Sequence, residues 1–154
     1  LFFALIGMIY GRTHTRDITK LGGLLKVMPF ISVIYVIAGM ASLGLPGFSG
    51  FVAEMNIFVG AFQHEGMFYR VATIISVSAI VVTAVYILRV LGIMLMGEVK
   101  NEEFLDLPKA TWFEITGILL LLIPMLGMGV APLWLSDMTM ESLEPFIQGV
   151  LNHL

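Results

Sequence analysis

A carboxylate beside an interrupted apolar stretch constrains this sequence more than any other feature. Residues 27–63 are almost wholly apolar, and Glu54 is the only charged residue among them. Proline removes a backbone donor and clashes with the preceding helical turn, and glycine lowers helix propensity. The pattern therefore predicts two half-helices with a break near residues 45–50, at a group of helix-breaking residues: Gly44, Pro46, Gly47 and Gly50.

The composition is that of a membrane protein. Of the 154 residues 58% are hydrophobic and only 12% are charged, with a mean hydropathy of +0.98, whereas about 25% of an average soluble domain is charged. Because lipid offers backbone groups no hydrogen-bond partners, a spanning chain is a helix or a closed barrel. We expect an all-α, polytopic integral membrane protein, with a discontinuous helix and an amphipathic C-terminal helix.

Composition also excludes several kinds of partner and cofactor. The net charge is -3 and the 8 basic residues form no dense cluster, so we expect no nucleic acid partner. Without cysteine there are no thiolate-bound clusters, and the three histidines are too scattered for a metal site. We therefore expect no cofactor and no metal in this chain.

Apolar segments divide the chain into membrane helices. We expect spans at about 1–10, at 28–63 with its break, at 71–96 and at 112–135, which together make up a membrane portion over residues 1–136. The first is too short to cross a bilayer, so we interpret the chain as the C-terminal piece of a longer protein. Residues 137–154 predict an amphipathic helix from apolar residues at helical spacing: Leu143, Phe146, Ile147, Val150, Leu151 and Leu154.

The segment 27–63 could cross the membrane once or twice. One discontinuous crossing places the basic connections 11–26 and 97–111 on the same inner side and the tail, which lacks Lys and Arg, outside. Two crossings would move Lys100 and Lys109 outside, which the positive-inside rule disfavours. We favour the single discontinuous crossing.

Glu54 allows a functional and a structural interpretation. A carboxylate inside an apolar span is costly, and it indicates a functional site by default. The simpler alternative is a carboxylate held by one hydrogen bond to a neighbouring helix, with no titration. Near the start of the second half-helix, the helix dipole favours the anion while desolvation favours the acid. We interpret Glu54 as a group that holds and releases a proton.

Three other residues are candidates for a polar pathway. Lys26 precedes the first half-helix, although a lysine there is more often an interfacial anchor whose amine reaches water. His14 could take part in proton transfer, as histidine side chains in general can, but between Arg12 and Arg16 a structural role is favoured, in a local polar network of His14, Arg16 and Asp17. The hydroxyl of Tyr86 could support a chain of waters. The simpler interpretation is that it forms an ordinary hydrogen bond to a neighbouring helix.

Several short motifs follow one another in the first third of the chain: Arg12–Asp17, Gly22–Leu24, Met28–Pro29, Ala41–Gly47 and Gly50–Glu54. In this order they strongly resemble the subunit M family of respiratory complex I (NADH:quinone oxidoreductase), one of the antiporter-like proton-translocating membrane subunits. The resemblance covers essentially the whole chain, and its motifs are weaker after residue 70. One departure is Ala53, where the family has glycine.

The resemblance implies a fold and a function. Such subunits consist of two inverted repeats with one broken helix each, and this chain would hold the second broken helix, two later helices and the lateral C-terminal helix. Glu54 matches the family's ionisable residue, which is a lysine in the sister subunits. The implied function is proton translocation across the bacterial inner membrane, with a periplasmic tail, other complex I membrane subunits as partners, and electron transfer in other chains.

Two alternatives remain beside this function. The same helix pattern occurs in subunits of multi-chain cation/proton antiporters and of membrane-bound hydrogenases. A non-pumping membrane scaffold, with the tail as a docking strap, would also explain the apolar helices. The scaffold predicts that Glu54 contacts one fixed partner and no water-filled path.

Overall fold

The computed structural model describes residues 1–151, and the expected all-α class is confirmed there. In chain order the helices are α1 (Phe2–Thr13), α2 (Leu24–Val27), α3 (Pro29–Ser42), α4 (Ser49–Gln63), α5 (Met67–Leu95), the short 3-10 helix η1 (Glu102–Asp106), α6 (Trp112–Val130) and α7 (Pro132–Leu151). In α7 the description leaves out the side chains of residues 135, 136, 142, 146–148, 150 and 151.

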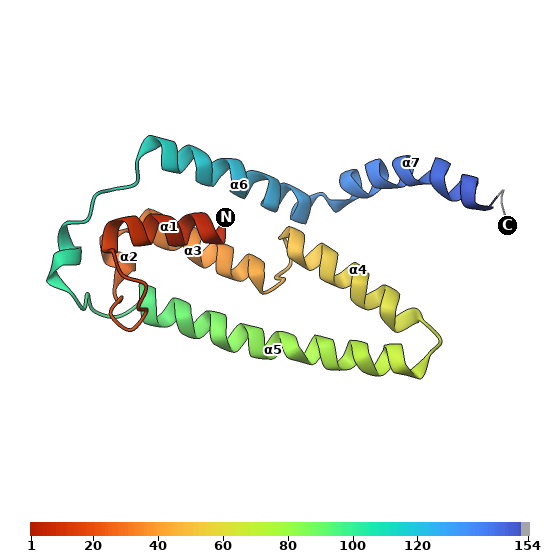
Figure 1. Ribbon diagram of the computed structural model, residues 1–154, viewed down its shortest axis with the longest axis horizontal. Helices are drawn as coiled ribbons and strands as arrows, with labels where there is room; N and C mark the ends of the chain where they lie inside the picture. The colour runs from red at the N-terminus through yellow and green to blue at the C-terminus, as the bar shows by residue number, and fades with distance from the viewer. Residues whose placement is uncertain (152–154) are drawn as a thin grey trace.

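The helices form an elongated bundle. α3 and α4 follow one another along its length, between α5 on one side and α6 on the other, and α1 packs beside α3 (Figure 1). α7 extends beyond the bundle, away from the N-terminus (Figure 1). The bundle therefore positions the connection between α3 and α4 near its middle.

In the described part of the chain, two helices are long and apolar enough to cross a membrane. α5 has 29 residues and α6 has 19, and only 11% of the most apolar window of each is buried. Apolar side chains on both helices instead point outward, as on Val82 and Leu120, which are 67% and 68% exposed. Such surfaces fit lipid or other protein helices, since water disfavours them.

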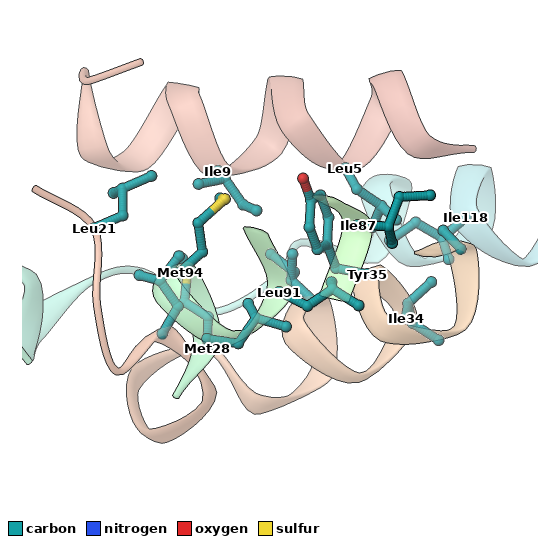
Figure 2. Close-up of a cluster of buried hydrophobic side chains, with 14 of the residues drawn as sticks. Leu5, Ile9, Leu21, Met28, Ile34, Tyr35, Ile87, Leu91, Met94 and Ile118 are labelled. Carbon is teal, nitrogen blue, oxygen red and sulfur yellow. The ribbon is translucent and has the colours of Figure 1, made fainter. Parts of the chain in front are cut away.

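A hydrophobic core joins α1, α2, α3, α5, η1 and α6. Leu5 of α1, Tyr35 of α3, Leu91 of α5 and Ile118 of α6 are all nearly inaccessible to solvent and pack in one cluster (Figure 2). The ring of Tyr35 also packs against that of Phe2, with 4.6 Å between the ring centroids and an angle of 42° between the rings. Because these contacts link segments far apart in the sequence, they fix α1 and α6 on α3.

The boundary between the last two helices differs from the prediction. The span expected over 112–135 ends at Val130, and α7 begins at Pro132 rather than near residue 137. A residue before proline is disfavoured in the α conformation, and Ala131 has φ -123° and ψ 64°. Pro124, in contrast, lies inside α6.

The amphipathic character of the tail stays a prediction. Of the residues that suggested it, Leu143 is exposed. Phe146, Ile147, Val150 and Leu151 have side chains outside the description, and Leu154 lies outside the described residues. The helix itself is present over residues 132–151.

A close backbone contact joins α6 to the connection between α3 and α4. Gly129, near the end of α6, lies so close to Gly47 and Phe48 that an added Cβ would overlap the Gly47 carbonyl and the Phe48 Cα. Backbone atoms cannot turn aside as a flexible side chain can. Only glycine at 129 permits this approach.

A bidentate ion pair fixes the opposite end of α6. The guanidinium of Arg12, at the end of α1, donates to both Glu114 oxygens, at 2.6 and 2.9 Å. It also donates to the carbonyls of Met8, Pro108 and Lys109, at 3.1, 2.8 and 3.2 Å. The side chain of Arg12 is 7% exposed, and its planar fork suits this arrangement where lysine does not.

Two polar connections lie against each other at this end of the bundle. The Gly23 N–H donates to the carbonyl of Met96 at 3.1 Å, and the Lys100 amine donates to the carbonyl of Thr19 at 2.7 Å. The turn between α4 and α5 lies at the other end (Figure 1). Connections 14–23 and 96–111 therefore belong to the same end of the molecule.

We predict that Gly129→Ala destabilises the protein. The new methyl group must push α6 away from the backbone of the connection, which corresponds to roughly 1–3 kcal/mol for overpacking. Gly127→Ala is the matched control, because a Cβ there meets nothing within 4 Å. Thermal unfolding of both variants of the full-length protein in detergent measures the difference, and equal midpoints would contradict the close approach.

Arg12→Lys should also destabilise the protein. One amine cannot replace two donors to Glu114 together with three to carbonyls, and losing hydrogen bonds of the charged group costs about 1.5–3 kcal/mol. The control is Arg70→Lys at an exposed position, which we expect to leave the midpoint of thermal unfolding unchanged. If the two variants melt alike, the ion pair does not hold α6.

Candidate functional site

The chain leaves helical geometry between Ser42 and Ser49. α3 ends at Ser42 and α4 begins at Ser49, so the interruption covers residues 43–48, slightly earlier than the 45–50 expected. Gly44 has φ 64° and Gly47 has φ 96°. These are left-handed conformations that glycine adopts without steric cost. Two of the four helix-breaking residues noted in the sequence therefore produce the turn directly.

Some backbone N–H groups of the interruption form hydrogen bonds with nearby carbonyl groups. The N–H of Leu43 donates to Met40, that of Gly44 to Ala41, and that of Phe48 to Leu45, at 3.2, 3.2 and 3.3 Å. Such bonds close the end of α3 with tight turns, and they matter because lipid leaves backbone groups without partners.

The carboxylate of Glu54 packs against this interruption. Glu54 is the sixth residue of α4 and half-buried, and helical side chains lean toward the N-terminus of their helix. Its carboxylate therefore reaches back to Gly44, where an added Cβ would collide with Oε2 and Cδ. The left-handed glycine leaves the space that the carboxylate occupies. Sequence reasoning named both residues but had no signal for their contact.

A groove lies on the other face of α4. It encloses about 580 Å³ between α4, the end of α6 and α7, and its lining includes Ser49, Asn56, Met128 and Thr139. Residues two apart on a helix point about 200° apart, so Asn56 and Glu54 face nearly opposite ways. Glu54 does not line this groove.

The remaining predicted pathway residues do not gather around Glu54. Lys26 is exposed in α2, and the 14 residues of α3, about 20 Å of helix, separate it from the interruption. Tyr86 is 55% exposed on α5. His14 ends α1 in a left-handed conformation, φ 50°, and its N–H donates to Tyr10 at 2.8 Å. The roles expected for Lys26, His14 and Tyr86 stay predictions.

The polar network expected among His14, Arg16 and Asp17 is wrong. The side chain of Arg16 lies over the ring of Tyr10, 4.8 Å from its centroid. Asp17 Oδ1 accepts from the N–H and hydroxyl of Thr19, at 2.9 and 2.6 Å. Side chains such as that of Asp readily accept a hydrogen bond from the backbone N–H two residues further on. Asp17 therefore bonds to Thr19 within its own turn and not to His14 or Arg16.

Sequence reasoning missed the Arg12–Glu114 pair. Arg12 was noted only as a basic loop residue, and Glu114 only as part of an apolar span. The single available signal was Thr111 followed three residues later by Glu114, a capping box that the structure contains. That signal predicts a helix start, and it does not identify a partner from α1.

Comparison with known proteins defines the class of this chain. A family model described as NADH:quinone oxidoreductase/Mrp antiporter, transmembrane, matches residues 1–83. The match covers more than half of the 154 residues, including the interruption and Glu54. The chain belongs to this family of antiporter-like membrane subunits, which confirms the resemblance found in the motifs.

Individual relatives are more specific. The chain is 37% identical over 137 residues to NAD(P)H-quinone oxidoreductase chain 4 3 of Trichormus variabilis, covering 86% of this chain and 25% of the relative. It is 32% identical over 130 residues to NADH-quinone oxidoreductase subunit M of Rickettsia felis, covering 84% and 26%. It is 36% identical over 145 residues to chain 4 of Gloeobacter violaceus, covering 90% and 27%. The chain spans about a quarter of the length of these relatives.

We predict that Gly44→Ala costs more stability than Gly47→Ala. Both positions have positive φ, so each variant loses roughly 1 kcal/mol from backbone strain. Only at Gly44 does the new methyl group also displace the Glu54 carboxylate, since a Cβ at Gly47 meets nothing within 4 Å. Thermal unfolding compares the two variants of the full-length protein.

A double-mutant cycle tests the cause of that difference. In a Glu54→Ala background the carboxylate is gone, so Gly44→Ala should cost no more than Gly47→Ala. An excess cost that persists without the carboxylate would show that Gly44 and Glu54 are not in contact.

Proposed function

We propose that this chain is part of a proton-translocating membrane subunit of NADH:quinone oxidoreductase and that Glu54 is its proton-holding group. The observation that carries the proposal is the half-buried Glu54 carboxylate packed against the left-handed Gly44 where two helices meet. An ionisable residue beside irregular backbone is a typical ion site in a membrane protein. The matching subunits belong to a redox enzyme, whose electron transfer would take place in other chains.

The proposed topology has α3 and α4 as one discontinuous crossing. The contact between connections 14–23 and 96–111 supports it, because both then lie on the same side of the membrane. With the positive-inside rule this side is cytoplasmic, and α7 is periplasmic in a bacterial inner membrane. α7 is then the lateral amphipathic helix, with other membrane subunits of the complex and lipid as neighbours.

The arrangement suggests how Glu54 holds a proton. Its carboxylate lies beside an interruption whose backbone is held in place, and the side chain is only half-buried, so it can be reached from outside the bundle. The groove lined by Asn56 lies on the opposite face of α4. We therefore assign the proton path to the Gly44 side of α4.

A second candidate is a subunit of a multi-chain cation/proton antiporter. The observation in its favour is that the matching family model describes both assemblies. The same glutamate would then exchange its proton for a cation moving in the opposite direction. A membrane-bound hydrogenase subunit has no separate observation in its favour. For a non-pumping scaffold the observation is that Glu54 does not line the groove beside α4, and the pumping measurement below distinguishes it from a pump.

The test is proton pumping by the assembled complex carrying Glu54→Gln. The amide retains the shape against Gly44 but cannot ionise, so we expect coupled turnover to fall by roughly tenfold or more while assembly is intact. Glu65→Gln, in the exposed turn before α5, is the matched control and should pump normally. Proton translocation, quinone reduction and assembly are measured together in reconstituted vesicles. Normal pumping by Glu54→Gln would contradict the proposal.

A further inference from the structure

The end of α6 lies beside the start of α4, where the connection from α3 arrives (Figure 1). A Cβ added at Gly129 would overlap the carbonyl of Gly47 and the Cα of Phe48. A Cβ at Gly127 meets nothing within 4 Å, and Val130 is 75% exposed. Of these three residues of α6, Gly129 is therefore the one that lies against the connection.

A short and stiff stretch of backbone links this contact to Gly44. The N–H of Phe48 donates to the carbonyl of Leu45 at 3.3 Å, and Leu45 directly follows Gly44. Pro46 lies between them, and its fixed φ leaves the connection few ways to absorb a displacement. A shift of Phe48 is therefore passed on toward Gly44.

The two half-helices leave the connection no spare length. The N–H of Gly44 donates to the carbonyl of Ala41 at 3.2 Å, and a Cβ at Gly50 would lie 3.0 Å from the same carbonyl. The end of α3 and the first turn of α4 are thus already in close contact. A displacement at Gly47 and Phe48 cannot be absorbed there, so it changes how Gly44 lies relative to α4.

The carboxylate of Glu54 depends on that relation. An added Cβ at Gly44 would collide with the Glu54 carboxylate, so the two residues are in direct contact. The overlap that a Cβ would make at Gly129 is as severe as the one at Gly44. A methyl group on α6 therefore displaces the connection far enough to alter this contact.

We propose that Gly129 is a positioning residue for Glu54. By letting the backbone of α6 approach the connection, it fixes Gly44 against α4 and so determines where the Glu54 carboxylate lies. The effect on pumping rests on the proton-holding role proposed for Glu54, whereas the effect on the contact between Gly44 and Glu54 does not.

A comparison of double-mutant cycles tests the positioning without reference to pumping. The coupling between Gly44→Ala and Glu54→Ala is measured by thermal unfolding of the full-length protein in detergent, in otherwise wild-type protein and with Gly129→Ala or Gly127→Ala added. We expect Gly129→Ala to lower this coupling to roughly half or less, and Gly127→Ala to leave it unchanged. A methyl group that only destabilised the protein would lower every midpoint and leave the coupling as it was.

A second variant acts on the same stretch of backbone from within the connection. Pro46→Ala keeps Gly129 in place but frees φ at position 46, so the coupling between Gly44 and Glu54 should fall in this background too. It decides the question even where Gly129→Ala does not assemble. Unchanged coupling in either background overturns the proposal, as does the absence of coupling in otherwise wild-type protein.

Proton pumping by the assembled complex in vesicles measures the consequence for function. Gly129→Ala should lower pumping about threefold with assembly intact, because small displacements of a reacting group are costly, and Gly127→Ala should pump normally. Added to Glu54→Gln, Gly129→Ala should cause no further loss, since it acts through the carboxylate.

The outcomes separate this proposal from the function proposed above. Losses that multiply in the double variant would show that Gly129 acts by another route, and they overturn the positioning role. Normal pumping by Glu54→Gln alone contradicts the proton-holding role instead, and the unfolding cycles then decide by themselves whether Gly129 positions the carboxylate.

Discussion

The need to satisfy backbone groups away from water governs the middle of this protein. Between Ser42 and Ser49 the regular helical bonds are lost, and each unpaired group in lipid costs several kcal/mol. Tight turns close the end of α3, and α6 covers the connection at Gly129 so closely that no side chain fits between them. The packing of α6 is therefore a condition for the interruption, and the position of Glu54 depends on both.

Contacts at both ends hold α6 in place. At its first turn, Glu114 is held by Arg12, whose remaining donors bind three carbonyls. At its last turn, Gly129 contacts the backbone of the interruption. A helix fixed at both ends has little freedom to slide, so the Arg12 ion pair supports the surroundings of Glu54 from the opposite end of the helix.

The sequence predicted the helices well and the contacts poorly. The apolar runs identified α5 and α6, and Gly44 and Pro46 located the interruption to within two residues, because propensity and hydropathy are local properties. The boundary at Pro132 was missed because the apolar run continues past it. The contact of Glu54 with Gly44, and that of Arg12 with Glu114, depend on how helices pack, and such pairings between distant segments leave no periodic signal in one sequence. The expected network around Asp17 failed for a local reason, since Thr19 competes for the same carboxylate.

The shortness of α3 and α4 also bears on how the protein is inserted into the membrane during synthesis. With 14 and 15 residues, each is about 21 to 23 Å long, less than the roughly 30 Å of the hydrocarbon core. In the single crossing proposed above, neither half can be released into lipid alone, so the insertion machinery must deliver them as a pair with their connection still uncovered. The glycine that covers that connection is in α6, which leaves the ribosome only after all of α5. The interruption is therefore completed late, after a long helix has already been made and placed beside it.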